Sequence, residues 1–119
     1  MLRNIPVMLE GYRLMVLEEP ELKTRKNEKT GEFETVTDFE GTPQYVISVH
    51  AKPRKKADGT RAGKGDEIRV TLETEPQEEI PDGAIVEFIN PRISHWENEL
   101  NGRAMSGLAW KATGVKLAG

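Results

Sequence analysis

Short stretches in which apolar and polar residues alternate follow one another along the chain. In residues 67–74 every second side chain is aliphatic, and in residues 44–50 the large apolar side chains again recur at every second position. Alternation with a period of two is the pattern of a half-buried β-strand. Asp-Gly or Asn-Gly dipeptides, which accept a positive φ, stand between such stretches at 58–59, 82–83 and 101–102. The pattern predicts strands at residues 12–17, 33–39, 44–50, 67–74, 84–89 and 105–117.

Helical patterns are weak by comparison. The best candidate is 93–100, where Trp96 and Leu100 are four residues apart, and the Asn-Gly pair that follows would end such a helix after barely two turns. We therefore predict an all-β protein: a small antiparallel barrel, similar to the oligonucleotide/oligosaccharide-binding (OB) fold, with a long charged hairpin and little helix. A single barrel domain is expected over residues 11–119, preceded by an N-terminal arm over residues 1–10.

Composition narrows the range of functions. The chain has 119 residues, of which 31% are charged and 36% hydrophobic, which fits one domain with a lean core. It has no cysteine, which excludes disulfides, a thiolate zinc site and a cysteine nucleophile. No apolar run approaches the ~20 residues of a membrane span. Its histidines, His50 and His95, lack partners at ligand spacing, so no metal and no cofactor are expected. We expect a cytoplasmic protein that is not an enzyme.

The net charge of -3 conceals two basic segments. Residues 23–29 carry four basic residues against one acid, residues 52–64 carry six against one, and an acidic run follows at 73–82. Basic clusters on an otherwise acidic protein favour contact with a polyanion, and the alternative is that they are solvated hairpin tips. The candidate nucleic-acid contacts in these segments are Lys23, Arg25, Lys26, Lys29, Lys52, Arg54, Lys55, Lys56, Arg61 and Lys64.

Three aromatic residues complete the candidate site. Proteins that bind single strands combine a basic groove with aromatic rings on which bases stack. Trp96 stands among polar residues, where a buried indole is less expected, so it is the favoured ligand-facing ring. Trp110 and Tyr45 lie in predicted strands and face either the ligand or the core, with the core favoured for both.

The last third of the chain combines an apolar strand that runs into Asn90-Pro91, an Asn-Gly-Arg-Ala-Met segment at 101–105, and a strand with Trp110. In these features the chain resembles small proteins encoded beside the relaxase and coupling genes of integrative and conjugative elements, of which the helicase processivity factor HelP is the best-known type. The resemblance implies an OB-like accessory protein that binds DNA and assists a translocating helicase or relaxase. The basic loop 52–64 and the N-terminal arm depart from that pattern, which leaves the protein partner open.

Together these features predict a single-stranded DNA-binding accessory protein of a mobile element or plasmid that supports helicase- or relaxase-driven replication or transfer. The alternative is a protein-interaction or structural β-module of a plasmid, conjugative element or phage that makes no contact with DNA. Such a module could dock by adding a strand at an exposed sheet edge. The expected partners are single-stranded DNA and a helicase or relaxase. No membrane association is expected, and the sequence leaves self-association open.

Overall fold

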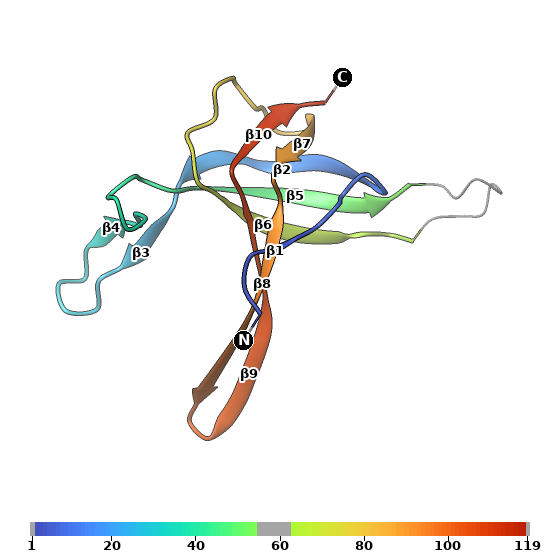
Figure 1. The fold of residues 1–119 in the computed structure, drawn as a ribbon. Helices are drawn as coiled ribbons and strands as arrows, with labels where there is room; N and C mark the ends of the chain where they lie inside the picture. The colour runs from blue at the N-terminus through green and yellow to red at the C-terminus, as the bar shows by residue number, and fades with distance from the viewer. Residues whose placement is uncertain (1, 55–62, 119) are drawn as a thin grey trace.

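Ten β-strands and no helix make up the residues that the computed structural model describes, 2–54 and 63–118 (Figure 1). The all-β class is confirmed, and the described part holds no helix that could cross a membrane. The strands are β1 (Ile5–Pro6), β2 (Tyr12–Leu22), β3 (Thr24–Lys26), β4 (Phe33–Thr35), β5 (Tyr45–Pro53), β6 (Asp66–Leu72), β7 (Ile85–Ile89), β8 (Arg92–Leu100), β9 (Arg103–Ala112) and β10 (Gly114–Leu117).

The helix suggested for residues 93–100 is wrong, because this segment is part of β8. Every residue of β8 pairs antiparallel with a residue of β9, up to Leu100 opposite Arg103 at the tip. Intrinsic propensity is a small term beside pairing with a neighbouring strand. The four-residue spacing of Trp96 and Leu100 therefore does not decide the local structure.

Eight strands form one sheet in the order β1-β8-β9-β6-β5-β2-β7-β10, and β3 pairs with β4 in a separate hairpin. Neighbouring strands of the sheet are antiparallel except β6 and β9, which run parallel with Val70 opposite Trp110. The order has two ends, β1 and β10, which do not pair with each other. One large sheet thus dominates the fold, without a closed ring of hydrogen-bonded strands.

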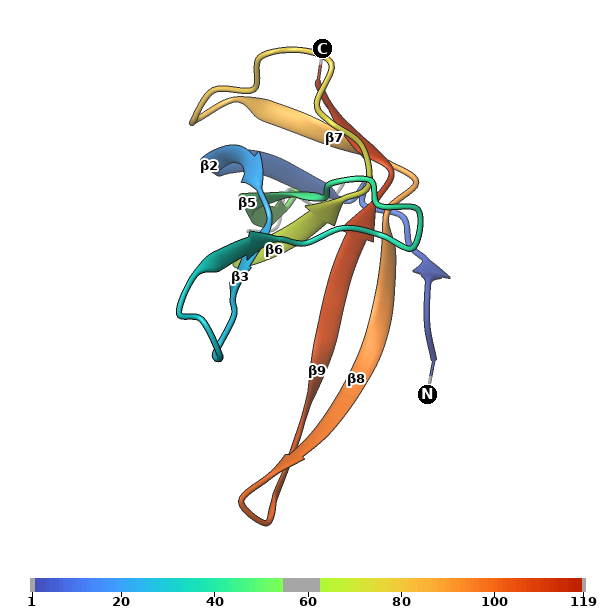
Figure 2. The ribbon, with the colours of Figure 1, turned by 90° about the vertical axis from the view of Figure 1, so that its left-hand side faces the viewer.

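Two bent segments connect the ends of this sheet. β7 leads into β8 through Asn90 and Pro91, and β9 leads into β10 through Thr113. Asn90 has a φ of 53°, which asparagine tolerates better than most residues, and Pro91 has no N–H to donate to a ladder. Each bent segment therefore contributes one strand near each end of the order: β7 and β10 lie at the top of the molecule and the β8–β9 ribbon hangs below (Figures 1 and 2).

Aliphatic side chains from distant parts of the chain meet in one core. Its buried members are Leu14, Val16, Ile47, Val49, Ala51, Val70, Leu72, Ile80, Val86, Ala112 and Val115. On β5, Val46 and Ser48 are buried as well, although they point away from Ile47 and Val49. The sequence pattern predicted one buried face for this strand, and the structure covers both. Burial of this apolar surface supplies the main driving force for folding.

The N-terminal segment, predicted to be an arm, follows one edge of the sheet. β1 pairs with β8, with Ile5 opposite Ile93, and Leu9 packs against the core. Further along, Arg54 Nε donates a hydrogen bond to the backbone oxygen of Glu10 at 3.0 Å. Residues 2–10 are therefore tied to the sheet at several points.

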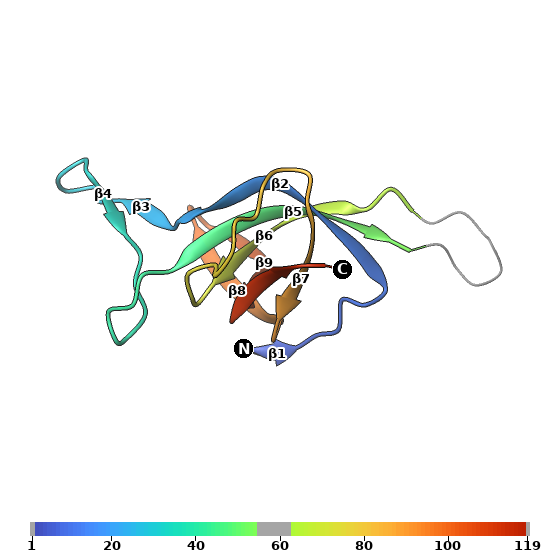
Figure 3. The same ribbon diagram turned by 90° about the horizontal axis from the view of Figure 1, so that it is seen from above.

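The molecule is elongated, with principal extents of 54 × 39 × 23 Å. Figure 3 shows the β3–β4 hairpin at one end and the outer ends of β5 and β6 at the other. The β8–β9 ribbon projects from the middle (Figures 1 and 2). The first basic segment is consequently at one end of the molecule, and the described basic residues of the second, Lys52, Arg54 and Lys64, are at the other.

Candidate nucleic-acid interface

A groove opens where β9 leaves β6. The two strands are paired only over Val70–Leu72 and Trp110–Ala112, and beyond Trp110 the ribbon diverges from the sheet. The β3–β4 hairpin stands on the other side, with β6 between (Figure 2). A cavity of about 350 Å³ lies in this groove. It is lined by Glu21, Leu22, Lys23, Thr24, Val46, Arg69, Thr71, Leu108, Ala109 and Trp110.

The floor of the groove is the face of the sheet opposite the core. On β6, Val70 and Leu72 point into the core, so Arg69 and Thr71 point out of it. Because Thr71 lies opposite Lys111 on β9, the Lys111 side chain shares this outer face. We refer to this surface as the groove face.

Lys23, Arg69 and Lys111 form a cluster of positive charge on the groove face. Lys23 lies between β2 and β3, and its Nζ donates a hydrogen bond to Thr71 Oγ1 at 3.0 Å. Burial lowers the pKa of Lys23 below its usual value, and the charges of Lys111 and Arg69 lower it further. Within residues 2–54 and 63–118 none of the three basic side chains forms an ion pair. Such a cluster is electrostatically unfavourable in the free protein and would be stabilised by a bound anion.

The groove face continues past Lys111 into a second depression of about 620 Å³. Here Arg92 of β8 forms an ion pair with Glu73, which neutralises part of the positive charge. The loop at residues 37–44 borders this depression and carries Phe39, whose side chain is fully exposed. Asp38, Glu40 and Glu73 also line the depression, so its charge is mixed, and Phe39 is an exposed ring on which a base could stack.

Trp96 lies on the groove face of the β8–β9 ribbon. It is opposite Gly107, and Gly107 lies on the same side of β9 as Lys111, four residues further on. A Cβ atom at residue 107 would come within 2.7 Å of Trp96 Cζ2, so the indole covers the glycine closely. The ring remains 39% exposed, which agrees with the exposure expected from its polar neighbours.

Trp110 and Tyr45 lie against the core instead. Trp110 is opposite Val70 and Tyr45 is opposite Leu72, and both of those aliphatic residues are fully buried. Both rings are partly buried and pack on the core cluster, although an edge of Trp110 lines the groove cavity. Of the three aromatic candidates, Trp110 is the one that lines the groove cavity, and strand alternation places Trp96 further out on the groove face of the ribbon.

The candidate basic residues are divided between the two ends of the molecule. Arg25, Lys26 and Lys29 are exposed on the β3–β4 hairpin, which borders the groove. Lys52, Arg54 and Lys64 lie at the far ends of β5 and β6. Lys55, Lys56 and Arg61 lie outside the described residues. The structure thus brings Lys23 and the first hairpin to the groove and leaves Lys52, Arg54 and Lys64 away from it.

Sequence reasoning missed Arg69, Lys111 and Phe39. Arg69 alternates with Val70 and Leu72, which were predicted to be buried and are, so the period-two pattern of that strand could have pointed to it. Lys111 likewise lies between Trp110 and Ala112, although Leu108, predicted on the same buried face, is exposed. Each of the two is a single basic residue between apolar neighbours, so it does not stand out when basic residues are counted along the sequence, whereas the segments 23–29 and 52–64 do. Phe39 gave no signal, since an aromatic residue in a β-like stretch is equally compatible with a core position.

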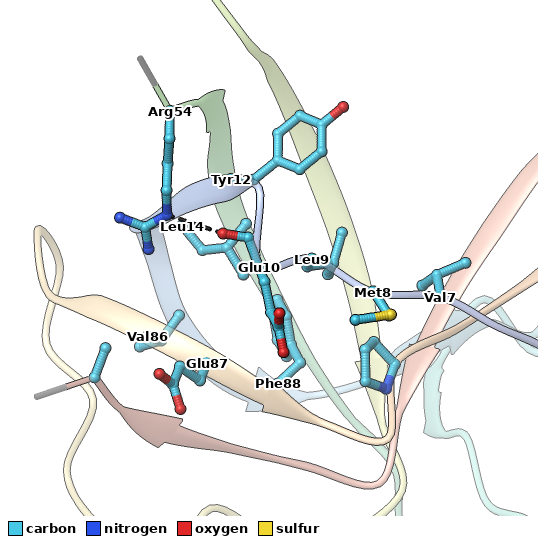
Figure 4. A pocket seen from close by; sticks show the side chains of 12 residues that line it. Val7, Met8, Leu9, Glu10, Tyr12, Leu14, Arg54, Val86, Glu87 and Phe88 are labelled. Carbon is cyan, nitrogen blue, oxygen red and sulfur yellow. Dashed lines mark hydrogen bonds between the residues drawn. The ribbon is translucent and has the colours of Figure 1, made fainter. Parts of the chain in front are cut away.

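A separate, mostly apolar cavity of about 280 Å³ lies between the N-terminal segment and β7 (Figure 4). Val7, Leu9 and Phe88 line it, and the Arg54 guanidinium at its rim is tied to the Glu10 backbone. The described residues hold no group of acidic and histidine side chains arranged to bind a metal ion. The lining of this cavity combines apolar side chains with carboxylate and guanidinium groups.

Comparison with known proteins found no matching protein family, curated protein or solved structure. The groove face is consequently the strongest basis for assigning a function.

The different environments of the two tryptophans lead to a testable contrast. Trp96→Ala should lower the affinity for single-stranded DNA by ~1–3 kcal/mol with little loss of stability, because the ring is an exposed stacking surface. Trp110→Ala should lower the free energy of unfolding by about 3 kcal/mol, because it removes a ring from the core. Thermal melting and oligonucleotide titration of both variants separate the two effects. If Trp96→Ala unfolds the protein while Trp110→Ala folds and loses binding, the two faces have been assigned the wrong way round.

Proposed function

We propose that the protein binds single-stranded DNA along the groove face, as a non-enzymatic accessory protein of a mobile element or plasmid. The observation that carries the proposal is the cluster of Lys23, Arg69 and Lys111, without ion-pair partners in the described residues, on the same face as Trp96. Basic side chains would contact phosphates, and the indole would stack on an unpaired base.

We further propose that the sheet is a partly open OB-type barrel. If β7–β8 and β9–β10 are each counted as one bent strand, five long strands remain, and the third pairs in parallel with the fifth. OB folds bind oligonucleotides on the face of strands 2 and 3, between the loop joining strands 1 and 2 and the loop joining strands 4 and 5. In this chain those parts correspond to β5 and β6, the β3–β4 hairpin and the tip of the β8–β9 ribbon. The groove lies at that position, which supports both proposals.

The accessory role rests on the resemblance of residues 84–112 to HelP-like helicase processivity proteins of integrative and conjugative elements. In such a role the protein would hold the displaced single strand while a helicase or relaxase acts, and would supply no catalytic group. Lys52 and Lys64, which are exposed at the far end from the groove, would be available to contact that enzyme.

The test is a fluorescence titration of a labelled oligonucleotide, as a single strand and as a duplex, at several salt concentrations. If three to five phosphates are contacted, the plot of log K against log salt should have a slope of roughly -2 to -3.5. The single strand should bind more tightly, because stacking requires unpaired bases. Affinity that does not depend on salt, or equal affinity for the duplex, would overturn the proposal.

A further inference from the structure

The outer edge of β9 has no partner strand over much of its length. Residues 103–109 pair with β8 on one side, and the described residues supply no backbone hydrogen bond on the other side until Trp110 reaches β6. An unpaired edge presents a row of free N–H and C=O groups that can accept another strand. The ribbon projects from the sheet (Figures 1 and 2), and near Leu108 and Ala109 this edge borders the groove cavity.

This edge also lacks the features that normally prevent pairing. Folded proteins protect open edges with charged side chains, prolines or bulges. Residues 104–109 contain none of these, whereas the free part of β8 on the opposite edge of the ribbon carries Glu97 and Glu99. Two large apolar side chains stand on the unprotected strand, Met105 at 51% and Leu108 at 54% exposure. The asymmetry indicates that the β9 edge is the one suited to a partner.

We propose that the β9 edges of two copies of this chain pair antiparallel about a two-fold axis at Met105. With a two-fold axis at Met105, a residue a given number of positions before Met105 lies opposite the residue the same number of positions after it in the second copy. The numbers of two opposite residues therefore sum to 210. Met105 would then face Met105 of the second copy, and Ala104 would face Ser106. Arg103 would face Gly107, beside the Trp96 indole that covers this glycine.

The side chains at these positions are compatible with that arrangement. Flexible methionines pack readily against each other, and alanine opposite serine brings no bulky or charged pair together. The Arg103 guanidinium would lie next to an aromatic ring, where a cation is favoured. No like charges meet at this register, because Arg103 faces a glycine. The inference concerns self-association and does not depend on the proposed binding of DNA.

The interface is short, so the dimer should be weak. Sedimentation of the intact chain between roughly 1 and 500 µM should show a concentration-dependent increase in mass, as expected for a small interface. Met105→Lys places two like charges opposite each other at the axis and should raise the dissociation constant at least about tenfold. Asn98→Lys is the matched control: Asn98 lies opposite Met105 on β8, so the variant carries the same charge on the same face of the ribbon but away from the β9 edge.

A charge-exchange experiment tests the axis itself. Met105→Glu and Met105→Lys should each be monomeric alone, and an equimolar mixture of the two should dimerise, because opposite charges then meet. Thermal melting of each variant verifies that it is folded. A wild-type chain that stays monomeric across the concentration range overturns the proposal. Equal weakening by Asn98→Lys, or no association in the mixture, also overturns it.

Discussion

Replacing Arg69 and Lys111 together by glutamine should weaken the binding of single-stranded DNA by on the order of 10–50-fold at 0.1 M salt. Each phosphate contact releases counterions, and for single strands each one contributes about 0.7 to the slope of log K against log salt. Losing two contacts should therefore make that slope shallower by about 1.4. Both side chains lie on the groove face, outside the core, so the free energy of unfolding should change little.

The matched control for this pair is Lys52→Gln with Lys64→Gln. It removes the same charge from the opposite end of β5 and β6, where both side chains are exposed. Both double variants lose two positive charges, so a difference between their affinities for DNA shows at which end of the molecule DNA binds. If the control loses as much affinity as Arg69→Gln with Lys111→Gln, binding is not centred on the groove face.

Gly65→Ala should lower the free energy of unfolding by about 2–4 kcal/mol. Gly65 precedes β6 and has a φ of 85°, a conformation that costs an alanine roughly 1–2 kcal/mol. A Cβ atom there would lie 2.4 Å from the backbone oxygen of Ala51 and 2.8 Å from Lys52 Cα. The backbone cannot yield without disturbing the β5–β6 ladder, in which Ala51 pairs with Asp66.

Gly83→Ala separates the cost of the positive φ from the cost of the steric clash at Gly65. Gly83 has nearly the same φ, 84°, but nothing lies within 4 Å of the added Cβ. Gly83→Ala should therefore lower the free energy of unfolding only by the cost of the positive φ, about 1 kcal/mol. Chemical denaturation of both variants measures the difference. Equal losses would mean that the close approach at Ala51 is relieved by a small local shift.

Most strands could be predicted from the sequence because their physics is local. Alternation of apolar and polar residues located β2, β5, β6, β7 and the β9–β10 segment, and the break at Asn90-Pro91 followed from the chemistry of proline. The helix prediction for residues 93–100 was wrong because the apolar residues of this segment are sparse and two of them are four residues apart. Only its pairing with β9 makes it a strand, and that partner is not encoded in its own pattern.

The candidate site was predicted in part. Lys23 and the exposed ring of Trp96 were identified, because a basic run and a polar neighbourhood are visible along the sequence. Arg69 and Lys111 come together only through the register of β6 on β9, which joins residues from distant parts of the chain. The run of basic residues at 52–64 did not indicate that Lys52, Arg54 and Lys64 would lie at the opposite end of the molecule from the groove.

The parallel pairing of β6 with β9 bears on how the chain folds. Successive hairpins such as β5–β6 and β8–β9 close short loops, whereas Val70 can meet Trp110 only after the intervening strands have been placed. Such non-local pairings slow folding to the millisecond-to-second range typical of all-β domains. On this argument the pairing of β6 with β9 contributes to the rate-limiting step of folding. Substitutions that weaken it should therefore slow folding, which stopped-flow refolding measures.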